Sequence, residues 1–355
     1  MAQIISKSIL VPHEVLRDFV SGCLAQAGLT QADSRLVANS LVESNLRGID
    51  SHGVARLPHY LNRIKHGSIC PKPNLKFSRI APALGRLDGD HGMGQIVMQC
   101  ATDQVITMAR EAGAGWIAVE NSTHCGALAY YGLQIAEAGM IGFVFTHSDS
   151  MVVPYAAKYP FCGTNPICFT APGEDGNSLC LDMATSIVPW NTITNAVIEE
   201  VEIPDHWAVD AEGNATTHPR QVRGVRPFGE YKGSGLGLMI DVLCSFLLGS
   251  PYGPDIAAMY GDPAAKRLLG GLVGAIDLSR FGSPGDVRHR LAELLRRWNA
   301  QEPANSDIPV LYPGQPEQLT RRHRLENGIP VGVNLIAIFE TLSKERGIPW
   351  KLSEN

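Results

Sequence analysis

The central part of the chain alternates between short apolar runs and longer segments with apolar residues at helical spacing. The helical spacing predicts helices over residues 95–112 and 128–138, and the short apolar runs predict strands over 116–119, 141–146 and 179–183. Strands that alternate with helices along a chain pack as a sheet covered by helices. The alternation therefore predicts an α/β domain, and it constrains the fold more than any other feature of the sequence.

A helical unit is predicted before this region. Residues 12–47 have the pattern of two helices, and the second begins with a capping pair formed by Thr30 and Asp33. The segment 47–60, RGIDSHGVARLPHY, then mixes Gly, Asp, His and Arg. Such a mixture is typical of a binding loop rather than of a core element.

Further helices are predicted after the central region. Residues 236–248 are apolar on nearly all sides, which predicts a buried helix, although Asp241 interrupts the run and argues against a membrane span. Another helix is predicted around 287–298, and a closing helix is expected to begin at Pro330. The Pro- and Gly-rich segment 309–316 predicts a loop between them.

Composition excludes several classes of partner. The chain has 355 residues, of which 45% are hydrophobic and 18% charged, so it can bury a large core. The formal charge of −5 is spread along the sequence, and no basic surface for nucleic acid or anionic lipid is indicated. Eight scattered cysteines without a C-x-x-C pair are typical of reduced thiols in a cytoplasm. We expect a cytoplasmic protein whose partner is a small molecule.

The usual nucleotide and metal signatures fail on their context. Residues 113–118 read G-x-G-x-x-A, but they follow a predicted helix and precede a strand, which reverses the order that a dinucleotide fingerprint needs. Lys232 does not follow the sixth position of a phosphate-binding loop, so an NTPase is not indicated. His59 and His66 are spaced for adjacent helical turns without a third acidic or thiol partner nearby, so no metal site is expected.

His124 is a candidate for proton transfer. The segment 121–126 follows a predicted strand and precedes a helix, which places this histidine where a strand end opens into a cleft. An imidazole can take a proton from a substrate hydroxyl while hydride leaves the same carbon, because its free pKa lies near neutral pH. A helix-capping histidine without chemistry is the alternative, and the histidine alone does not decide between them.

Three other segments carry candidate binding groups. Arg56 can hold a carboxylate with two parallel hydrogen bonds, and His52 and Tyr60 lie in the same stretch. The segments 181–186 and 231–236 each set small residues beside a charged side chain at an element boundary, which suits the phosphates or ribose of a cofactor. The alternatives are a helix start with a solvated face for the first segment and ordinary turn chemistry for the other two.

Taken together and in order, these motifs resemble the type 2 malate/lactate dehydrogenase family, which is unrelated in fold to the Rossmann-type enzymes of similar name. The matching segments run over nearly the whole chain: RGIDSHGVARLPHY at 47–60, the His124 segment, SDSMVVP at 148–154, GTNP at 163–166, DMATS at 182–186, KGSGL at 232–236 and YPGQPE at 312–317. The resemblance implies an α/β fold with a non-Rossmann mixed central sheet, an N-terminal helical unit and C-terminal helices. It further suggests a cofactor-binding domain over 81–317, and a second unit formed by residues 1–80 with 318–355 packed on it.

The resemblance also implies roles for single residues. In the catalytic role the matching positions are His124, as the proton acceptor, and His52. In contact with the substrate they are Arg56, Tyr60 and Arg267. In contact with the cofactor they are Ser148, Asp182, Met183, Ala184, Lys232, Gly314, Gln315 and Pro316.

The implied activity is hydride transfer between a nicotinamide cofactor and a small 2-hydroxy acid. The cofactor is NAD or NADP, with NAD slightly favoured, and the protein is expected to be a homodimer with its active site near the subunit interface. Stretches outside the shared core, among them SDSMVVP and Ile203 to Asp210, resemble members that act on ureidoglycolate. Malate, lactate, sulfolactate, a sugar-derived keto acid and a cyclic imine are alternative substrates, and a catalytically silent nucleotide-binding dimer is a further alternative.

Three positions depart from the family pattern. Cys125 follows the predicted catalytic histidine where Ser or Phe is frequent, and Ser234 replaces a frequent aromatic residue. Asn191 and Thr192 replace a frequent Gly-Lys pair. The first departure is expected to alter the shape of the pocket, and the other two to alter the fit of the cofactor.

Overall fold

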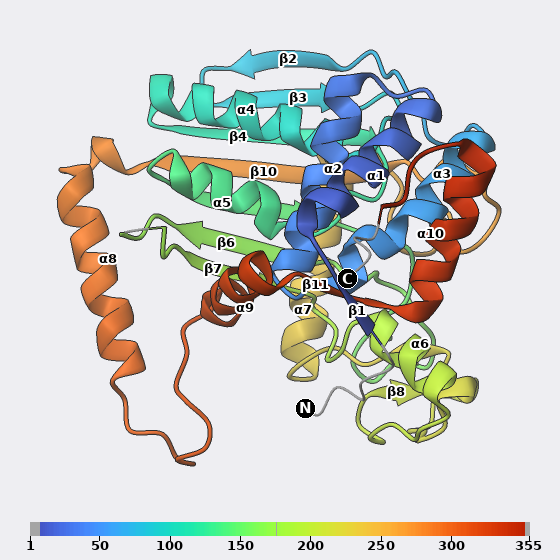
Figure 1. Ribbon diagram of the computed structural model, residues 1–355. Coiled ribbons are helices and arrows are strands. Elements are labelled where there is room, and N and C mark those ends of the chain that lie inside the picture. The colour runs from blue at the N-terminus through green and yellow to red at the C-terminus, as the bar shows by residue number, and fades with distance from the viewer. Residues whose placement is uncertain (1–7, 175, 352–355) are drawn as a thin grey trace.

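The computed structural model describes residues 8–174 and 176–351, and its centre is a seven-stranded mixed sheet (Figure 1). Across the sheet the strands follow the order β2-β3-β4-β10-β5-β6-β7. Only β3 and β4 are parallel, and every other neighbouring pair is antiparallel. The strands are β2 Lys76–Ala81, β3 Leu84–Asp88, β4 Ala114–Ser122, β5 Met140–Thr146, β6 Ile167–Ala171, β7 Leu179–Met183 and β10 Leu269–Asp277. This confirms the predicted α/β class with a non-Rossmann mixed sheet.

Glycines allow the central strand β10 to pack closely against its neighbours. A Cβ on Gly274 would lie 2.3 Å from the ring of Trp116, and one on Gly270 would lie 1.9 Å from the carbonyl oxygen of Cys244. Glycine weakens a strand in general, but it permits another group to approach the backbone closely. β10 can therefore pack both an indole ring and a helix closely against the face beneath α7 while it pairs with both β4 and β5.

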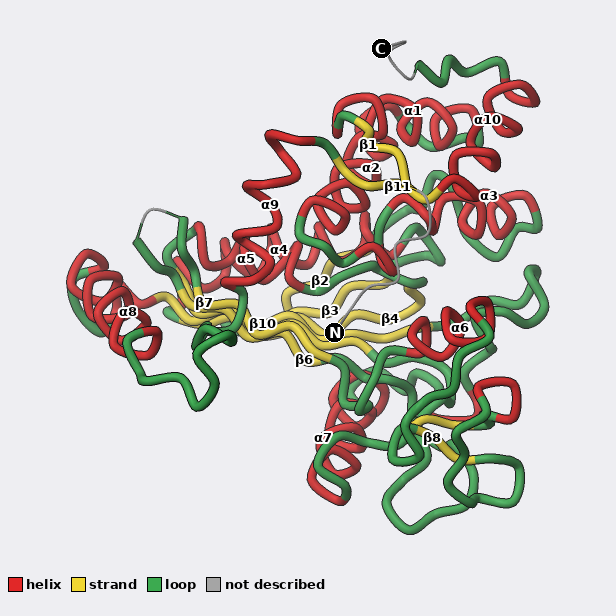
Figure 2. The backbone as a smooth tube through the Cα atoms, turned by 60° about the horizontal axis from the view of Figure 1, so that its bottom comes forward, coloured by secondary structure: helices red, strands yellow, loops and turns green. Residues whose placement is uncertain are grey.

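Helices cover the two faces of the sheet unequally (Figure 2). The helices α4, Gly94–Ala112, and α5, Ala129–Glu137, lie on one face and share a large apolar core with it. On the opposite face lies α7, Tyr231–Asp241, which continues as a π-helical segment over Val242–Phe246. The apolar cluster beneath α7 is much smaller. The helices predicted over 95–112 and 128–138 are confirmed.

The prediction of a buried helix over 236–248 is wrong both in the bounds of the helix and in its burial. The helix begins at Tyr231, and only one side of it faces the sheet. Its outward side chains are exposed: Leu238, Met239, Val242, Phe246 and Leu247. An all-apolar helix is usually interior, but the single chain leaves this apolar side uncovered.

The N-terminal helices form a second core with the end of the chain (Figure 1). The helices α1 His13–Gln26, α2 Gln31–Leu46, α3 Leu57–Lys65 and α10 Val333–Arg346 pack around it. Strand β1, Ser8–Val11, pairs with β11, Ile329–Gly332, in an antiparallel register. The predicted cap is confirmed, because the backbone N–H of Asp33 donates to Thr30 Oγ1 at 3.1 Å. The closing helix begins at Val333, and Pro330 lies in β11 instead.

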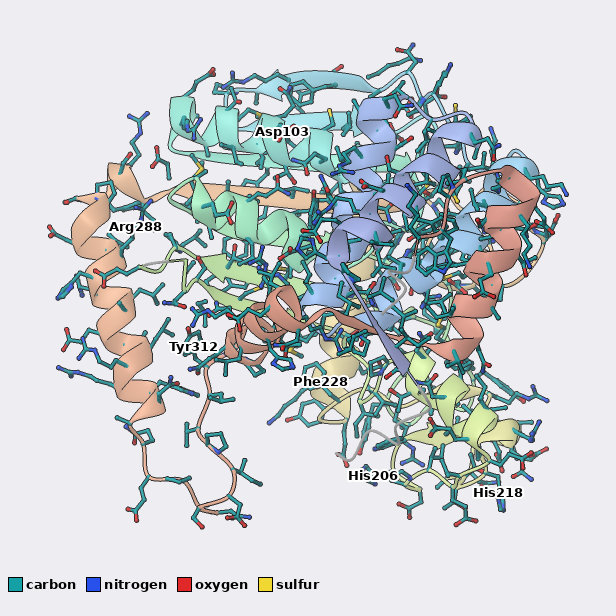
Figure 3. All side chains as sticks on the ribbon, in the orientation of Figure 1. Asp103, His206, His218, Phe228, Arg288 and Tyr312 are labelled. Atoms are coloured by element: carbon teal, nitrogen blue, oxygen red, sulfur yellow. The ribbon has the colours of Figure 1, made fainter. Side chains whose placement is uncertain are left out.

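The remaining elements lie at the periphery. A small lobe contains α6 Trp190–Glu199, β8 Ala208–Val209 and β9 Gly224–Val225 around its own apolar cluster. The helix predicted around 287–298 is confirmed as α8, Pro284–Asn299, and α9 follows at Gln315–Asn327. Figure 3 shows Arg288 on α8 at one end of the molecule and His218 on the lobe at the other.

The division of the chain into two domains at residue 80 stays a prediction. β2 crosses that boundary and pairs with β3, while the core that holds α1 to α3 also contains Ile336 and Phe339 of α10. Residues 1–7 and 352–355 of the proposed N-terminal unit lie outside the described residues. In the described part of the chain, no helix combines the length and apolarity that crossing a membrane requires.

Candidate active site

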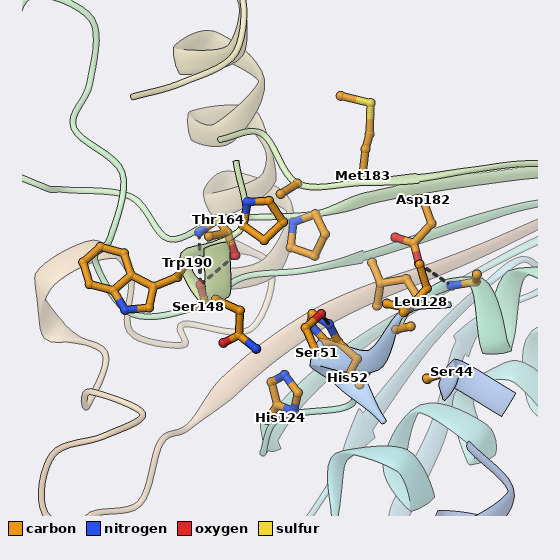
Figure 4. A pocket seen from close by; sticks show the side chains of 18 of the residues that line it. Ser44, Ser51, His52, His124, Leu128, Ser148, Thr164, Asp182, Met183 and Trp190 are labelled. Atoms are coloured by element: carbon orange, nitrogen blue, oxygen red, sulfur yellow. Dashed lines mark hydrogen bonds between the residues drawn. The ribbon is translucent and has the colours of Figure 1, made fainter. Parts of the chain in front are cut away.

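A cavity of about 680 Å³ lies where the N-terminal helices, the sheet and the small lobe meet (Figure 4). This volume falls within the usual range for small-molecule and cofactor sites, about 300–1,000 Å³. Its lining residues come from 43–56, 124–130, 148–166, 180–191 and 259–267, together with Phe228, Gly314 and Glu317. Three of the segments singled out in the sequence, at 47–60, 148–154 and 182–186, therefore meet at one site.

His124 follows the end of β4 and lines the cavity. Gly94, the first residue of α4, lies so close to this loop that a Cβ would be 2.6 Å from the carbonyl oxygen of His124. Burial, together with the neighbouring His52 and Arg56, lowers the pKa of His124 well below its ordinary value. A lowered pKa keeps the imidazole neutral at neutral pH, which is the form that can accept a proton.

Tyr60 lies behind His124 and fixes one of its ring nitrogens. The Tyr60 hydroxyl is 2.7 Å from His124 Nδ1 and accepts a hydrogen bond from Gln95 Nε2 at 3.0 Å. Tyr60 is only 1% exposed and lines a much smaller cavity on the far side of the histidine. Burial raises the pKa of Tyr60, so the phenol keeps its proton. The predicted substrate contact of Tyr60 stays a prediction, and the geometry favours a positioning role.

His52 lies beside His124 in the short 3₁₀ turn Asp50–His52. The two imidazole rings are stacked with their centroids 5.5 Å apart, and Ser51 Oγ lies 2.9 Å from His52 Nδ1. Burial, with a further contribution from Arg56, lowers the pKa of His52 to about 4. His52 is therefore also neutral at neutral pH.

Arg56 presents its guanidinium to the cavity at the start of α3. Its Nε donates to the carbonyl of Ser51 at 2.6 Å, Nη1 donates to the hydroxyl of Tyr260 at 2.5 Å, and Nη2 donates to Asn191 Oδ1 at 3.1 Å. All three acceptors are neutral. Within residues 8–174 and 176–351 Arg56 forms no ion pair. Its positive charge is available to an anionic substrate.

Arg267 also lines the cavity, but its charge is already paired. Its Nη2 contacts Asp149 Oδ1 in an ion pair, and Nε donates to the carbonyl of Ala257 at 3.0 Å. The other carboxylate oxygen of Asp149 accepts the backbone N–H of Met259 at 3.1 Å. Arg267 is 2% exposed and Asp149 is 7% exposed, so water screens this pair little.

A second buried arginine fastens the segment 258–265, which carries Tyr260. Arg63 on α3 donates from Nη2 to the carbonyls of Ala258 and Met259, at 3.1 and 2.9 Å. Its Nη1 donates to the carbonyl of Ala265 at 3.0 Å. Arg63 thereby fixes this segment to the helix that also carries Tyr60.

The other end of the cavity contains most of the predicted cofactor contacts. Ser148, Asp182, Met183, Ala184 and Gly314 all line it. The N-terminus of α9 opens here, and backbone N–H groups at a helix N-terminus suit the phosphates of a dinucleotide. A nicotinamide dinucleotide therefore fits the residues present.

Two features of this end follow from local packing. Gly314 has φ +93°, and a Cβ there would lie 2.9 Å from Cys180 Cβ, so only glycine lets α9 begin against β7. The Asp182 carboxylate accepts the backbone N–H of Ala129 at 2.7 Å in the first turn of α5. Burial raises the pKa of Asp182 to about 6.

Three predicted cofactor contacts lie outside the cavity lining. Gln315 and Pro316 belong to the first turn of α9, next to Gly314 but away from the cavity surface. Lys232 is exposed near the start of α7, with its ammonium 6.0 Å from the centroid of the Tyr231 ring. Their contact with a cofactor stays a prediction.

Sequence reasoning missed Asp149, Tyr260 and Asn191 as functional candidates. Asp149 lies inside the SDSMVVP stretch, in which the family resemblance implies a role for Ser148 alone. Asn191 was expected to alter cofactor fit, whereas it binds Arg56. The charge of Asp149 beside a chosen residue was the one available signal. Among the described residues, no group of three His, Cys, Asp or Glu side chains is placed to hold a metal ion.

Comparison with known proteins identifies the family. Residues 11–339 match the model of the malate/L-lactate dehydrogenase family. Ureidoglycolate dehydrogenase (NAD(+)) of Escherichia coli O157:H7 is 36% identical over 321 residues, which cover 90% of this chain and 92% of that protein. Malate dehydrogenase of Pyrococcus abyssi is 32% identical, with 96% of each chain covered. The crystal structure of malate dehydrogenase from Entamoeba histolytica superposes with a TM-score of 0.92 at 25% identity, over 97% of this chain and 99% of that one.

The match to the family model includes the residues that line the cavity and the central sheet with its helices. His124, Arg56 and the N-terminus of α9 all lie within the matched residues. The chain therefore belongs to the malate/L-lactate dehydrogenase family, and it is an NAD(P)-dependent dehydrogenase that acts on the CH–OH group of a 2-hydroxy acid.

Proposed function

We propose that this enzyme uses NAD and that its substrate is ureidoglycolate, a 2-hydroxy acid with a ureido group. The observation that carries the residue assignment is that His124 and Arg56 line the same end of the cavity, one neutral and one positively charged. A carboxylate held by Arg56 brings the neighbouring hydroxyl to the imidazole. The ureidoglycolate dehydrogenase of E. coli, which is named for NAD(+), supports the choice of substrate and cofactor.

His124 is proposed to carry the proton. Nδ1 is engaged by Tyr60, which leaves Nε2 for the substrate. When Nδ1–H donates to the Tyr60 oxygen, Nε2 has a free electron pair and accepts the proton of the substrate hydroxyl. In the reverse direction the imidazolium formed in this way, with Nδ1–H still donating to the Tyr60 oxygen, returns the Nε2 proton to the keto oxygen and becomes neutral again. The same tautomer therefore serves both directions of the reaction. His52 is a second candidate for a catalytic role, passing the proton to Ser51.

The bound nicotinamide would supply the hydride acceptor. The residues proposed to hold the dinucleotide are Ser148, Asp182, Met183, Ala184 and Gly314 with the N-terminus of α9. The family resemblance adds Gln315, Pro316 and Lys232. The two stacked histidines are half-buried and line the cavity on the side where the proposed proton transfer takes place.

The test is turnover by the purified protein. Absorbance of the reduced nicotinamide is followed with NAD and with NADP, against ureidoglycolate, malate, lactate and sulfolactate, and in reverse with a cyclic imine. We expect turnover with ureidoglycolate and NAD. The variant His124→Ala should lose at least about 100-fold in kcat, because a positioned acid or base contributes about 10²–10⁴-fold, while the Kd for NAD stays unchanged. Equal loss of NAD binding, or full activity of the variant, would contradict the assignment.

We further propose a homodimer in the cytoplasm. The uncovered apolar side of α7 and its π-helical continuation, with Leu238, Met239 and Phe246 between 41% and 64% exposed, supports a contact with a second copy. The eight cysteines are all free, which is consistent with a reducing compartment. Light scattering should give twice the mass of one chain, and Phe246→Glu should reduce it to one, whereas a monomeric wild type would refute the dimer.

A further inference from the structure

We propose that Asp149 restricts the substrate to 2-hydroxy acids with a single anionic group and an uncharged tail that donates hydrogen bonds. The inference rests on the proposed function, because it concerns the specificity of the same cavity. It separates a ureido or amide tail from the second acidic group of malate or sulfolactate.

The first step is the balance of fixed charge around the substrate. Three charged side chains of the cavity lining, Arg56, Arg267 and Asp149, are assigned to the substrate. Of the other charged lining residues, Glu43 and Arg47 pair with each other, and Asp182 and Glu317 lie at the cofactor end, by the starts of α5 and α9. The pKa values of His52 and His124 are lowered by burial, so both rings are neutral at neutral pH. One positive charge therefore remains after Asp149 has neutralised Arg267.

The second step is that Asp149 and Arg267 form a closed pair: both are fully engaged with each other and with the backbone, so Arg267 is not free to bind an anionic group of the substrate. Both side chains are buried, and each is held by a further backbone partner, Met259 N–H for Asp149 and the Ala257 carbonyl for Arg267. An anion that approached Arg267 would have to meet the Asp149 carboxylate as well. Separating a buried pair costs more than the new contact returns.

The third step concerns the nearby charges that do not line the cavity. Arg63 is not part of the cavity lining, and its two terminal nitrogens donate to three carbonyls behind the wall, so it does not face the substrate. Asp262 and Lys266 are exposed on the same segment, where water screens them. These groups therefore do not change the charge balance at the substrate, where Arg56 supplies the one unpaired positive charge among the described residues.

The consequence is selection by the charge of the tail. Arg56 holds the carboxylate beside the hydroxyl, and the tail then lies toward the neutral oxygens of Asn191 and Tyr260 and the carboxylate of Asp149. N–H groups of a ureido or amide tail can donate to these oxygens. A second anionic group would lose its hydration there and would find no further unpaired positive charge in the described part of the chain in return, because Asp149 neutralises Arg267, so we expect a loss of at least about tenfold.

The experiment compares malate with its C4 monoamide, which differ in the charge of one group but hardly in size. We measure kcat/KM with NAD, and the Kd of each acid by calorimetry with NADH present. In the wild type, kcat/KM should be at least about tenfold higher for the monoamide. In Asp149→Asn, which leaves the Arg267 charge unpaired, the ratio should fall at least tenfold and malate should gain. The control Asp262→Asn removes an exposed carboxylate and should leave the ratio unchanged.

The outcomes separate this proposal from the proposed function. Equal or better use of malate than of its monoamide by the wild type would overturn the role of Asp149 while hydride transfer stands. Absence of turnover on every 2-hydroxy acid would refute the proposed function, and the two Kd values would still test the charge selection. Because the wild-type ratio needs no variant, the test holds even if Asp149→Asn fails to fold.

Discussion

Replacing Tyr60 with phenylalanine removes one oxygen atom and should affect both folding and catalysis. The hydroxyl serves two buried groups, His124 Nδ1 at 2.7 Å and Gln95 Nε2 at 3.0 Å. Each buried polar group left without a partner costs about 1–3 kcal/mol, so the loss of both contacts should lower the free energy of unfolding by about 2–6 kcal/mol. Without this hydrogen bond the imidazole ring of His124 can also turn away from the substrate. A misplacement of about 1 Å costs on the order of 100-fold in kcat.

The assays are urea unfolding and steady-state kinetics, with Tyr155→Phe as the control. Tyr155 is 54% exposed, and its hydroxyl makes no hydrogen bond in the described part of the chain, so neither quantity should change. If Tyr60 positions His124, kcat falls while KM for the acid changes little. If Tyr60 instead contacts the substrate, KM rises at nearly constant kcat. Wild-type kcat and stability in Tyr60→Phe would refute the reasoning altogether.

Three further outcomes are expected. Because burial, His52 and Arg56 lower the pKa of His124, kcat/KM for oxidation should stay level as pH falls through 6.5, and Arg56→Gln should shift the acid limb upward; a limb at 6.5 in the wild type would contradict this. Gly314→Ala should cost about 1–3 kcal/mol of stability and raise KM for NAD, whereas the control Gly347→Ala, with φ +64° and open space around it, should lose only the stability. Thr30→Ala should lower the free energy of unfolding by about 1 kcal/mol without a change in activity, measured by urea unfolding, and no loss would mean that the cap is dispensable.

The sequence predicts the periodic parts of the fold well. The helix over 95–112 and the strand over 179–183 agree with α4 and β7, because their apolar spacing records which face is buried. β10 shows the limit of this approach. Its glycines argue against a strand locally, and the reason for them, the ring of Trp116 and the backbone of Cys244, becomes visible only in three dimensions.

The site shows the same division. Arg56 and His124 are found from their chemical types and their places at element ends. That Tyr60 lies behind His124 depends on the packing of α3 against the loop after β4. The closed pair of Asp149 and Arg267 joins residues 118 positions apart, and no local pattern announces it.

The way Arg63 holds the segment 258–265 bears on how new specificities can arise. The arginine binds main-chain carbonyls, which every residue type provides, so the backbone position does not depend on the side chains of the segment. Point mutations at position 260 can therefore present new groups to a substrate at an unchanged place relative to His124. The contacts that fix the segment are thus independent of the side chain that faces the substrate. Enzymes of this kind can therefore change their specificity for small acids through position 260 while the catalytic centre stays the same.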